Sequence, residues 1–171
     1  MSRLRRLVVS DSWFFITCRV LPWRGILTAS EFACWGGVIH ERRKKHGFLL
    51  SAWVFLPNHW HAIFYPPYPL TISRVMEAIK VGATKRINYF RGELGLLFPP
   101  RFLDRALRTV KGEKVEYIHL NPVQAGWAKR PEDWPWSSVP DYTGNLTDAP
   151  VTPSGLSVDR VWLPADPRTP I

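Results

Sequence analysis

The sequence predicts an α+β fold in which helices pack on one face of an antiparallel sheet. Two β-prone stretches, residues 48–56 and 59–65, flank a Pro-Asn turn and predict a hairpin. Thr28 and Glu31 match a capping box at the start of one helix. Apolar residues at helical spacing between positions 71 and 91 predict a second helix.

The elements before the hairpin follow from composition and turn residues. Residues 13–18 are β-prone and almost continuously apolar, and therefore predict a first strand. Pro22 to Gly25 form a turn, after which the helix capped by Thr28 should run to about His46. Two adjacent glycines at 36 and 37 weaken this helix, at about 1 kcal/mol each relative to alanine.

The elements after the hairpin complete the sheet. The helical period at 71–91 follows a proline-rich break, and residues 101–108 could form a strand or begin a helix. We assign a strand, because the order β-α-β-β-α-β closes a compact ferredoxin-like (RRM-like) sheet. A third helix is predicted from about Gly112 to Leu120, and Pro122 should end or kink it.

The chain is predicted to hold one folded domain and a tail. Its 171 residues suit a single domain, which we place at residues 1–143. Residues 144–171 are rich in proline and lack periodicity, so we expect an extended, poorly packed C-terminal tail.

Charge and cysteine usage limit the class of protein. The net charge of +9 and pI of about 10.0 favour a polyanionic partner such as nucleic acid. Cys18 and Cys34 form no Cys-x-x-Cys pair, which argues against a disulfide scaffold or a zinc ribbon. No apolar run is long enough to span a membrane, and the basic N-terminus does not resemble a signal peptide, so we expect a cytoplasmic protein.

Two histidines at the start of the third predicted strand carry most of the functional information. His59 and His61 are two positions apart, so their imidazoles should lie on one face of the strand, with Trp60 on the other. They could be two structural histidines. They could also converge on one divalent metal and leave positions for a third ligand and a substrate.

A tyrosine on the third predicted helix could share this site. Tyr117 and Asn121 are four residues apart and therefore lie on one helical face, provided that Pro122 does not displace Asn121. A phenol beside a metal is a potential nucleophile.

Three segments together resemble a known family. Residues 53–61, Trp-Val-Phe-Leu-Pro-Asn-His-Trp-His, resemble the His-hydrophobic-His motif of the HUH single-strand endonucleases. Residues 117–127 and 130–138 resemble the C-terminal motif of the REP-associated tyrosine transposases, and residues 101–108 resemble the segment that this family carries between the two motifs. The resemblance covers roughly residues 10–142, with one departure at Pro99, where relatives often have glutamine.

The resemblance implies an activity and a set of site residues. His59 and His61 would bind a divalent metal, Mg²⁺ or Mn²⁺, with Asn121 as a third polar ligand, and Tyr117 would be the nucleophile. The implied reaction is transesterification of single-stranded DNA beside a palindromic hairpin through a 5′-phosphotyrosine intermediate, carried out by a monomer. We also predict a set of basic DNA contacts: Arg3, Arg5, Arg6, Arg42, Arg43, Lys44, Lys45, Lys80, Lys85, Arg86 and Arg101.

Two alternatives remain at this point. One is a non-catalytic relative that holds hairpin DNA or RNA on the same fold, although pure binding needs neither the histidines nor the tyrosine. The other is a hydrolase that uses the histidine pair to hold a metal-bound water.

Overall fold

The computed structural model describes residues 10–107, 112–143 and 153–159. Arg3, Arg5 and Arg6 therefore lie outside the described residues. The elements in chain order are β1 (Trp13–Arg19), η1 (Pro22–Arg24), α1 (Ala29–His46), β2 (Leu49–Leu56), β3 (His59–Tyr65), α2 (Ile72–Arg91), β4 (Leu103–Leu107), α3 (Gly112–Gln124), η2 (Pro131–Asp133) and α4 (Val139–Thr143).

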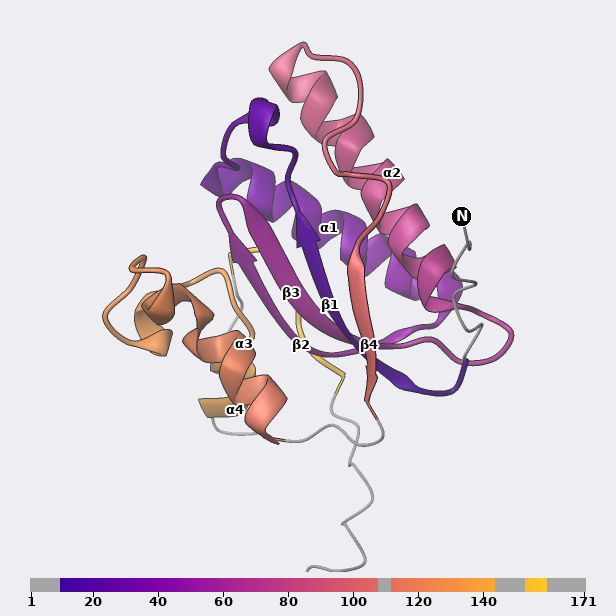
Figure 1. The fold of residues 1–171 in the computed structure, drawn as a ribbon, viewed down its shortest axis with the longest axis vertical. Helices are drawn as coiled ribbons and strands as arrows, with labels where there is room; N and C mark the ends of the chain where they lie inside the picture. The colour runs from indigo at the N-terminus through magenta and orange to yellow at the C-terminus, as the bar shows by residue number, and fades with distance from the viewer. Residues whose placement is uncertain (1–9, 108–111, 144–152, 160–171) are drawn as a thin grey trace, which may run out of the picture.

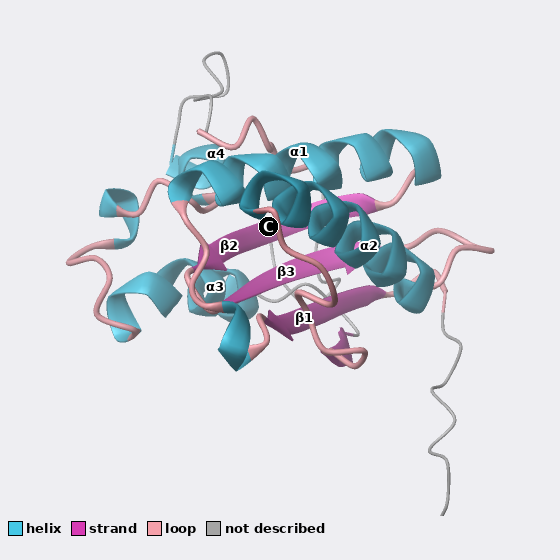
Figure 2. Cartoon of the chain, turned by 90° about the horizontal axis from the view of Figure 1, so that it is seen from above, coloured by secondary structure: helices cyan, strands magenta, loops and turns pink. Residues whose placement is uncertain are grey.

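The four strands form one antiparallel sheet in the order β2-β3-β1-β4 (Figure 1). This is the ferredoxin-like order that the sequence predicted, and the strand expected at 101–108 is present as β4, Leu103–Leu107, with residue 108 outside the described residues. The capping box at Thr28 and the left-handed Gly47 bound α1 as expected. Figure 2 shows α1 and α2 side by side over the strands.

Alternation along the strands divides the core between the two faces of the sheet. Trp60, Ala62 and Phe64 of β3 pack with α1 and α2 in the larger core cluster. Ile63 faces the opposite side, in a smaller cluster with Ala52, Val54 and Leu56 of β2. The sheet is therefore buried on both sides near β2 and β3.

Helix α3 covers this second face, so it does not share the layer of α1 and α2. Val115 and Ile118 bury their side chains in the smaller cluster. Complete burial of an aliphatic side chain contributes roughly 1.5–3 kcal/mol. These two contacts therefore fix which side of α3 meets the sheet.

The prediction that α3 ends or kinks near Leu120 is wrong in one respect. The helix continues through Pro122 to Gln124. Proline lacks an N–H and removes one helical hydrogen bond, but so close to the end of the helix it disturbs only the last turn. Asn121 consequently stays on the helix, on the same face as Tyr117.

The expectation of a poorly packed tail is wrong for its described part. Leu156 is fully buried in the core, and Asp159 makes two hydrogen bonds to the backbone of Leu50 on β2. Further along β2, Phe55 and Trp53 bond to the backbone of residues 136 and 138. These contacts cover the outer edge of β2, which would otherwise expose unpaired backbone groups. The proposed domain limit at residue 143 itself stays a prediction.

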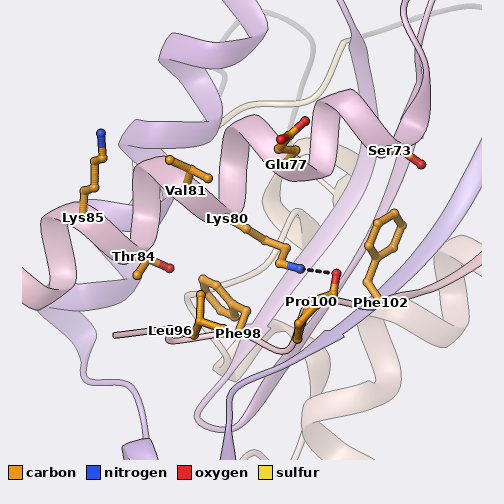
Figure 3. A pocket seen from close by; sticks show the side chains of 10 residues that line it. All are labelled: Ser73, Glu77, Lys80, Val81, Thr84, Lys85, Leu96, Phe98, Pro100 and Phe102. Atoms are coloured by element: carbon orange, nitrogen blue, oxygen red, sulfur yellow. Dashed lines mark hydrogen bonds between the residues drawn. The ribbon is translucent and has the colours of Figure 1, made fainter. Parts of the chain in front are cut away.

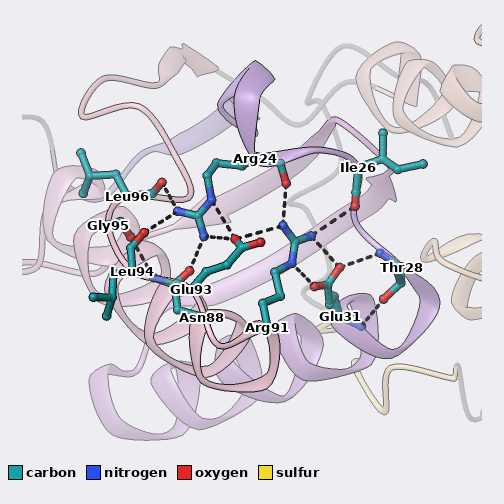
Figure 4. A network of polar contacts seen from close by, with 10 residues as sticks. All are labelled: Arg24, Ile26, Thr28, Glu31, Asn88, Arg91, Glu93, Leu94, Gly95 and Leu96. Carbon is teal, nitrogen blue, oxygen red and sulfur yellow. Dashed lines mark hydrogen bonds and ion pairs between the residues drawn. The ribbon is translucent and has the colours of Figure 1, made fainter.

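A network around two arginines holds the loop after β1 against the helices (Figure 4). Arg91 of α2 bonds to Glu31 of α1 and to the Arg24 and Ile26 carbonyl oxygens. Arg24 in turn bonds to Glu93 and to the backbone beyond it. Burial alone would raise the pKa of Glu31, but the hydrogen bonds from Arg91 and Thr28 hold the pKa below its usual value.

The same loop supports the turn that leads into β3. Val20 and Leu27 donate backbone hydrogen bonds to the carbonyl oxygens of Asn58 and Pro57, at 2.8 Å each. The network in Figure 4 therefore holds the backbone on which His59 begins.

The paired glycines of α1 provide a test of how the tail is packed. A Cβ on Gly36 would lie 2.6 Å from the Cβ of Ser154, whereas a Cβ on Gly37 meets nothing within 4 Å. We expect Gly36→Ala to lower the free energy of unfolding by about 1–3 kcal/mol through overpacking. Gly37→Ala should raise it by up to about 1 kcal/mol, because alanine favours the helix. Urea unfolding of both variants measures this contrast, and equal stabilisation by the two would show that residue 154 does not pack on α1.

His119 of α3 gives a pH prediction. Its Nε2 lies 2.9 Å from the Ser138 hydroxyl, and burial lowers its pKa to about 4. The unfolded chain, with an ordinary histidine pKa near 6.5, binds this proton first as the pH falls. Stability from this group is therefore fully present above about pH 6.5 and is lost progressively towards pH 4, by up to about 3 kcal/mol. Denaturant unfolding between pH 7.5 and 4.5 should show a shallower pH slope for His119→Gln than for the parent. An unchanged slope would contradict the assignment.

Candidate active site

A hollow of about 420 Å³ opens on the face of the sheet that α3 covers. Strands β1 and β3, the turn before β3, the start of β4, and α3 all contribute to its wall. Its lining residues are Thr17, Arg19, Asn58, His59, His61, Leu103, Tyr117 and Asn121. Four segments far apart in the sequence thus meet at one place.

Strand alternation positions the two histidines as the sequence predicted. Their rings lie 5.0 Å apart between centroids, and both face the hollow. Trp60, between them, is fully buried on the other face, where its ring contacts Trp35. Trp60 therefore belongs to the core and does not take part in the hollow.

Neighbouring side chains fix the orientation of both imidazoles. The Nδ1 of His59 lies 2.6 Å from the Asn58 Oδ1, which can only accept, so this nitrogen carries the proton. The Nδ1 of His61 lies 2.9 Å from the Thr17 hydroxyl. The Nε2 atoms therefore carry the lone pairs, and the Nε2 of His61 accepts from the Nδ2 of Asn121 at 3.2 Å. Metal-binding histidines are commonly held in this way.

The electrostatic surroundings keep both rings neutral near pH 7. Burial is the largest cause that lowers the pKa of His61, to about 4, and the neighbouring His59 and Arg19 add to it. The pKa of His59 is also below its usual value, chiefly through burial. Neutral imidazoles are the form that binds metals.

Helix α3 brings Tyr117 and Asn121 to the same hollow. The ring of Tyr117 lies 5.7 Å from that of His61 and 5.8 Å from that of Phe15, and 41% of the residue is exposed. Asn121 is buried, with its Nδ2 3.2 Å from the Nε2 of His61. Half a turn of the amide would present Oδ1 in place of Nδ2.

These side chains fit a hard divalent cation with mixed ligands. Among the described residues, no three His, Cys, Asp or Glu side chains cluster as a metal site. Besides the two imidazoles, the donors on the wall of the hollow are neutral amide and hydroxyl oxygens. Two imidazoles and one amide oxygen differ from the closed tetrahedral set of a structural zinc site, and they leave coordination positions open on a divalent metal.

Most of the predicted basic DNA contacts lie elsewhere. Arg42, Arg43, Lys44 and Lys45 are at the C-terminal end of α1, in the helical layer on the other side of the sheet. Arg43 is bound to Asp159 and to the Ser157 carbonyl oxygen. Arg86 of α2 pairs with Glu41 at 2.6 Å.

Lys80 and Lys85 line a different hollow, of about 570 Å³, between α2 and residues 96–102 (Figure 3). Lys80 points inwards and donates to the carbonyl oxygens of Pro99 and Pro100, whereas Lys85 points away from the aromatic wall. Arg101 is exposed just before β4. None of these three residues lines the hollow around the histidines.

Sequence reasoning missed Thr17, Asn58 and Arg19 as members of the site. The sequence predicts Asn58 only as part of a turn and Thr17 only as part of a strand, and it gives Arg19 no role. The register of β1 against β3, which pairs Thr17 with His61 and Arg19 with His59, brings the last two to the site. A single sequence carries no clear signal for such a register.

Known proteins share both this sequence and this fold. No family model matches the chain. A curated relative, the REP-associated tyrosine transposase of Escherichia coli (strain K12), is 30% identical over 161 residues, which cover 86% of this chain and 94% of the relative. The chain therefore belongs to the REP-associated tyrosine transposase family.

Two solved structures resemble the fold of this chain. The structure of a REP-associated tyrosine transposase bound to a REP hairpin is 28% identical, with a TM-score of 0.71, and the match covers 86% of this chain and 94% of that one. A Deinococcus radiodurans R1 protein provisionally assigned as a transposase is 14% identical, with a TM-score of 0.50 over 74% of this chain and 98% of its own, and supports the fold alone. Within the described residues, no helix is long and apolar enough to cross a bilayer.

Proposed function

We propose that this protein is a metal-dependent single-strand DNA endonuclease and strand transferase that acts beside DNA hairpins through a tyrosine nucleophile. The observation that carries this proposal is the convergence of His59, His61 and Tyr117 on one hollow from β3 and α3. Membership in the transposase family supports it independently.

The partly exposed phenol of Tyr117 is accessible to a phosphodiester placed in the hollow. In the proposed step its oxygen forms a bond to phosphorus while the bond from phosphorus to the 3′-oxygen breaks. The phenol loses its proton, the 3′-oxygen takes one up, and the products are a 5′-phosphotyrosine and a 3′-hydroxyl. The reverse attack by the same or another 3′-hydroxyl rejoins DNA without an external energy source.

His59, His61 and Asn121 would hold the cation. A bound Mg²⁺ or Mn²⁺ would polarise the phosphate and offset the charge that builds during transfer. Thr17 and Asn58 contribute by fixing the imidazoles, and the burial of His61 keeps its ring uncharged.

The proposed substrate is single-stranded DNA flanking a hairpin. The net charge of +9 favours a polyanion, and the relative with a TM-score of 0.71 is bound to a REP hairpin. A single strand is flexible and can bend its scissile phosphate into the hollow, whereas a duplex is stiff and holds its backbone in a regular helix.

A covalent trapping experiment tests the nucleophile. The protein is incubated with Mn²⁺ and a hairpin oligonucleotide that has labelled single-stranded flanks, and the adduct is separated on a denaturing gel. Tyr117→Phe should abolish the adduct while sparing DNA affinity. Tyr89→Phe, at an 84% exposed position on α2, is the matched control and should form adduct normally.

The same gel separates the alternatives. A hydrolase that used a metal-bound water would still cut the labelled strand in the Tyr117→Phe variant. A non-catalytic binding protein would bind the probe without adduct or cleavage even in the parent. Either result would overturn the proposed transesterification.

Metal binding provides a second test that does not depend on activity. His59→Ala should abolish cleavage and weaken Mn²⁺ binding, measured by electron paramagnetic resonance titration. Thr17→Val removes the hydroxyl beside His61 and should weaken Mn²⁺ binding by roughly 10-fold or more, the usual effect of losing a partner of a ligating histidine. Thr17→Ser keeps the hydroxyl and should retain most of the affinity. Normal Mn²⁺ affinity in both His59→Ala and Thr17→Val would show that the metal does not bind in this hollow.

A further inference from the structure

Strand pairing places the basic residue Arg105 on the same face of the sheet as the candidate active site. Residues directly opposite one another in an antiparallel pair point to the same side of the sheet. β4 pairs with β1 so that Arg105 lies opposite Phe15, whose ring contacts His61 and Tyr117. Arg105 is exposed and thus extends from the site face of β4, while its neighbour Asp104 belongs to the opposite face.

A lysine on α3 lies beside the same aromatic ring. Lys114 is one helical turn before Tyr117, and its Nζ lies 5.8 Å from the Phe15 ring centroid and 5.9 Å from the Tyr117 ring centroid. Lys114 and Arg105 therefore come from two different elements to one side of the nucleophile.

Arg19 lies on the other side of the nucleophile. It is exposed at the end of β1, pairs in register with His59 and lines the hollow. Phe15 and Arg19 are four residues apart on one strand, a span of about 13 Å, which a few nucleotides can bridge. The three cations thus flank the histidines and the tyrosine at both ends.

The charges of these three residues are available to a ligand. None of them forms an ion pair with a carboxylate in the described part of the chain. By contrast, Arg43 and Arg86 in the α1–α2 layer are paired, and Lys80 is bound to backbone carbonyls.

We propose that Arg19, Arg105 and Lys114 bind successive phosphates of the single strand and lead it across the sheet, so that the scissile phosphate lies between them at Tyr117. This inference rests on the proposed function and adds the path of the substrate. It assigns strand binding to the β1–β4–α3 face rather than to the basic end of α1.

The salt dependence of binding tests this path. A plot of log affinity against log salt concentration has a negative slope. Each lost phosphate contact with a single strand decreases the magnitude of that slope by about 0.7. We expect that decrease for Arg19→Gln, Arg105→Gln and Lys114→Gln individually, and a decrease of about 2 for the triple variant. Binding of the full chain to a labelled unstructured oligonucleotide is measured in EDTA, so that neither metal nor cleavage contributes.

The double variant Lys44→Gln/Lys45→Gln is the matched control, because both residues are exposed at the far end of α1. It should keep the parent slope. An unchanged slope in the triple variant, or a larger loss in the control, would overturn the assigned path even if Tyr117 still forms its adduct. A hairpin without flanking strands is the second probe. An equal loss of slope on that probe would show that the three residues bind duplex phosphates and would also overturn the proposal.

Failure of the proposed function gives a different result. If the parent forms no adduct but the triple variant loses the predicted slope, the face binds a strand without cutting it. Circular dichroism of each variant at pH 7.5 checks that the fold is intact.

Discussion

The arrangement of the site depends on the packing of α3 against the face of the sheet that α1 and α2 leave open. Val115 and Ile118 are buried on β2 and β3, and this contact sets the rotation of the helix about its own axis. Tyr117 and Asn121 then face His61 because they lie on the adjacent side of the same helix. A different rotation of α3 would leave both histidines in place and remove the tyrosine from them.

Several features of the fold protect that arrangement. Ser138 bonds to His119 of α3 and to the backbone of Trp53 on β2, and so joins the helix to the sheet. At the other end of the hollow, the Arg24 and Arg91 network holds the loop that supports the Asn58 turn. These bonds hold α3 and the Asn58 turn, both of which contribute to the wall of the hollow, in place against the sheet.

The model also separates two populations of basic residues. Those on α1 and α2 are conspicuous in the sequence, but four of their arginines, Arg43, Arg74, Arg86 and Arg91, form ion pairs within the protein. Those on β1, β4 and α3 are scattered singly along the chain and come to one face only after folding, Arg105 and Lys114 beside Phe15 and Arg19 beside His59. The proposed strand path therefore uses isolated cations that folding brings to one face and not the run of charge at the end of α1.

Local sequence determined the elements of this protein and the direction of its most informative side chains. The Thr28 capping box, the helical period of α2 and the Pro57–Asn58 turn depend on neighbours within a few residues, and strand alternation alone turned His59 and His61 to one face.

Only the tertiary structure decided what those histidines meet. The contacts of Thr17, Tyr117 and Asn121 with His61 span 44 to 60 residues of sequence. Such contacts are set by strand register and helix packing, which a single chain's local pattern does not encode. The buried position of Leu156 has the same cause, since the space that receives its segment exists only where Gly36 lacks a side chain.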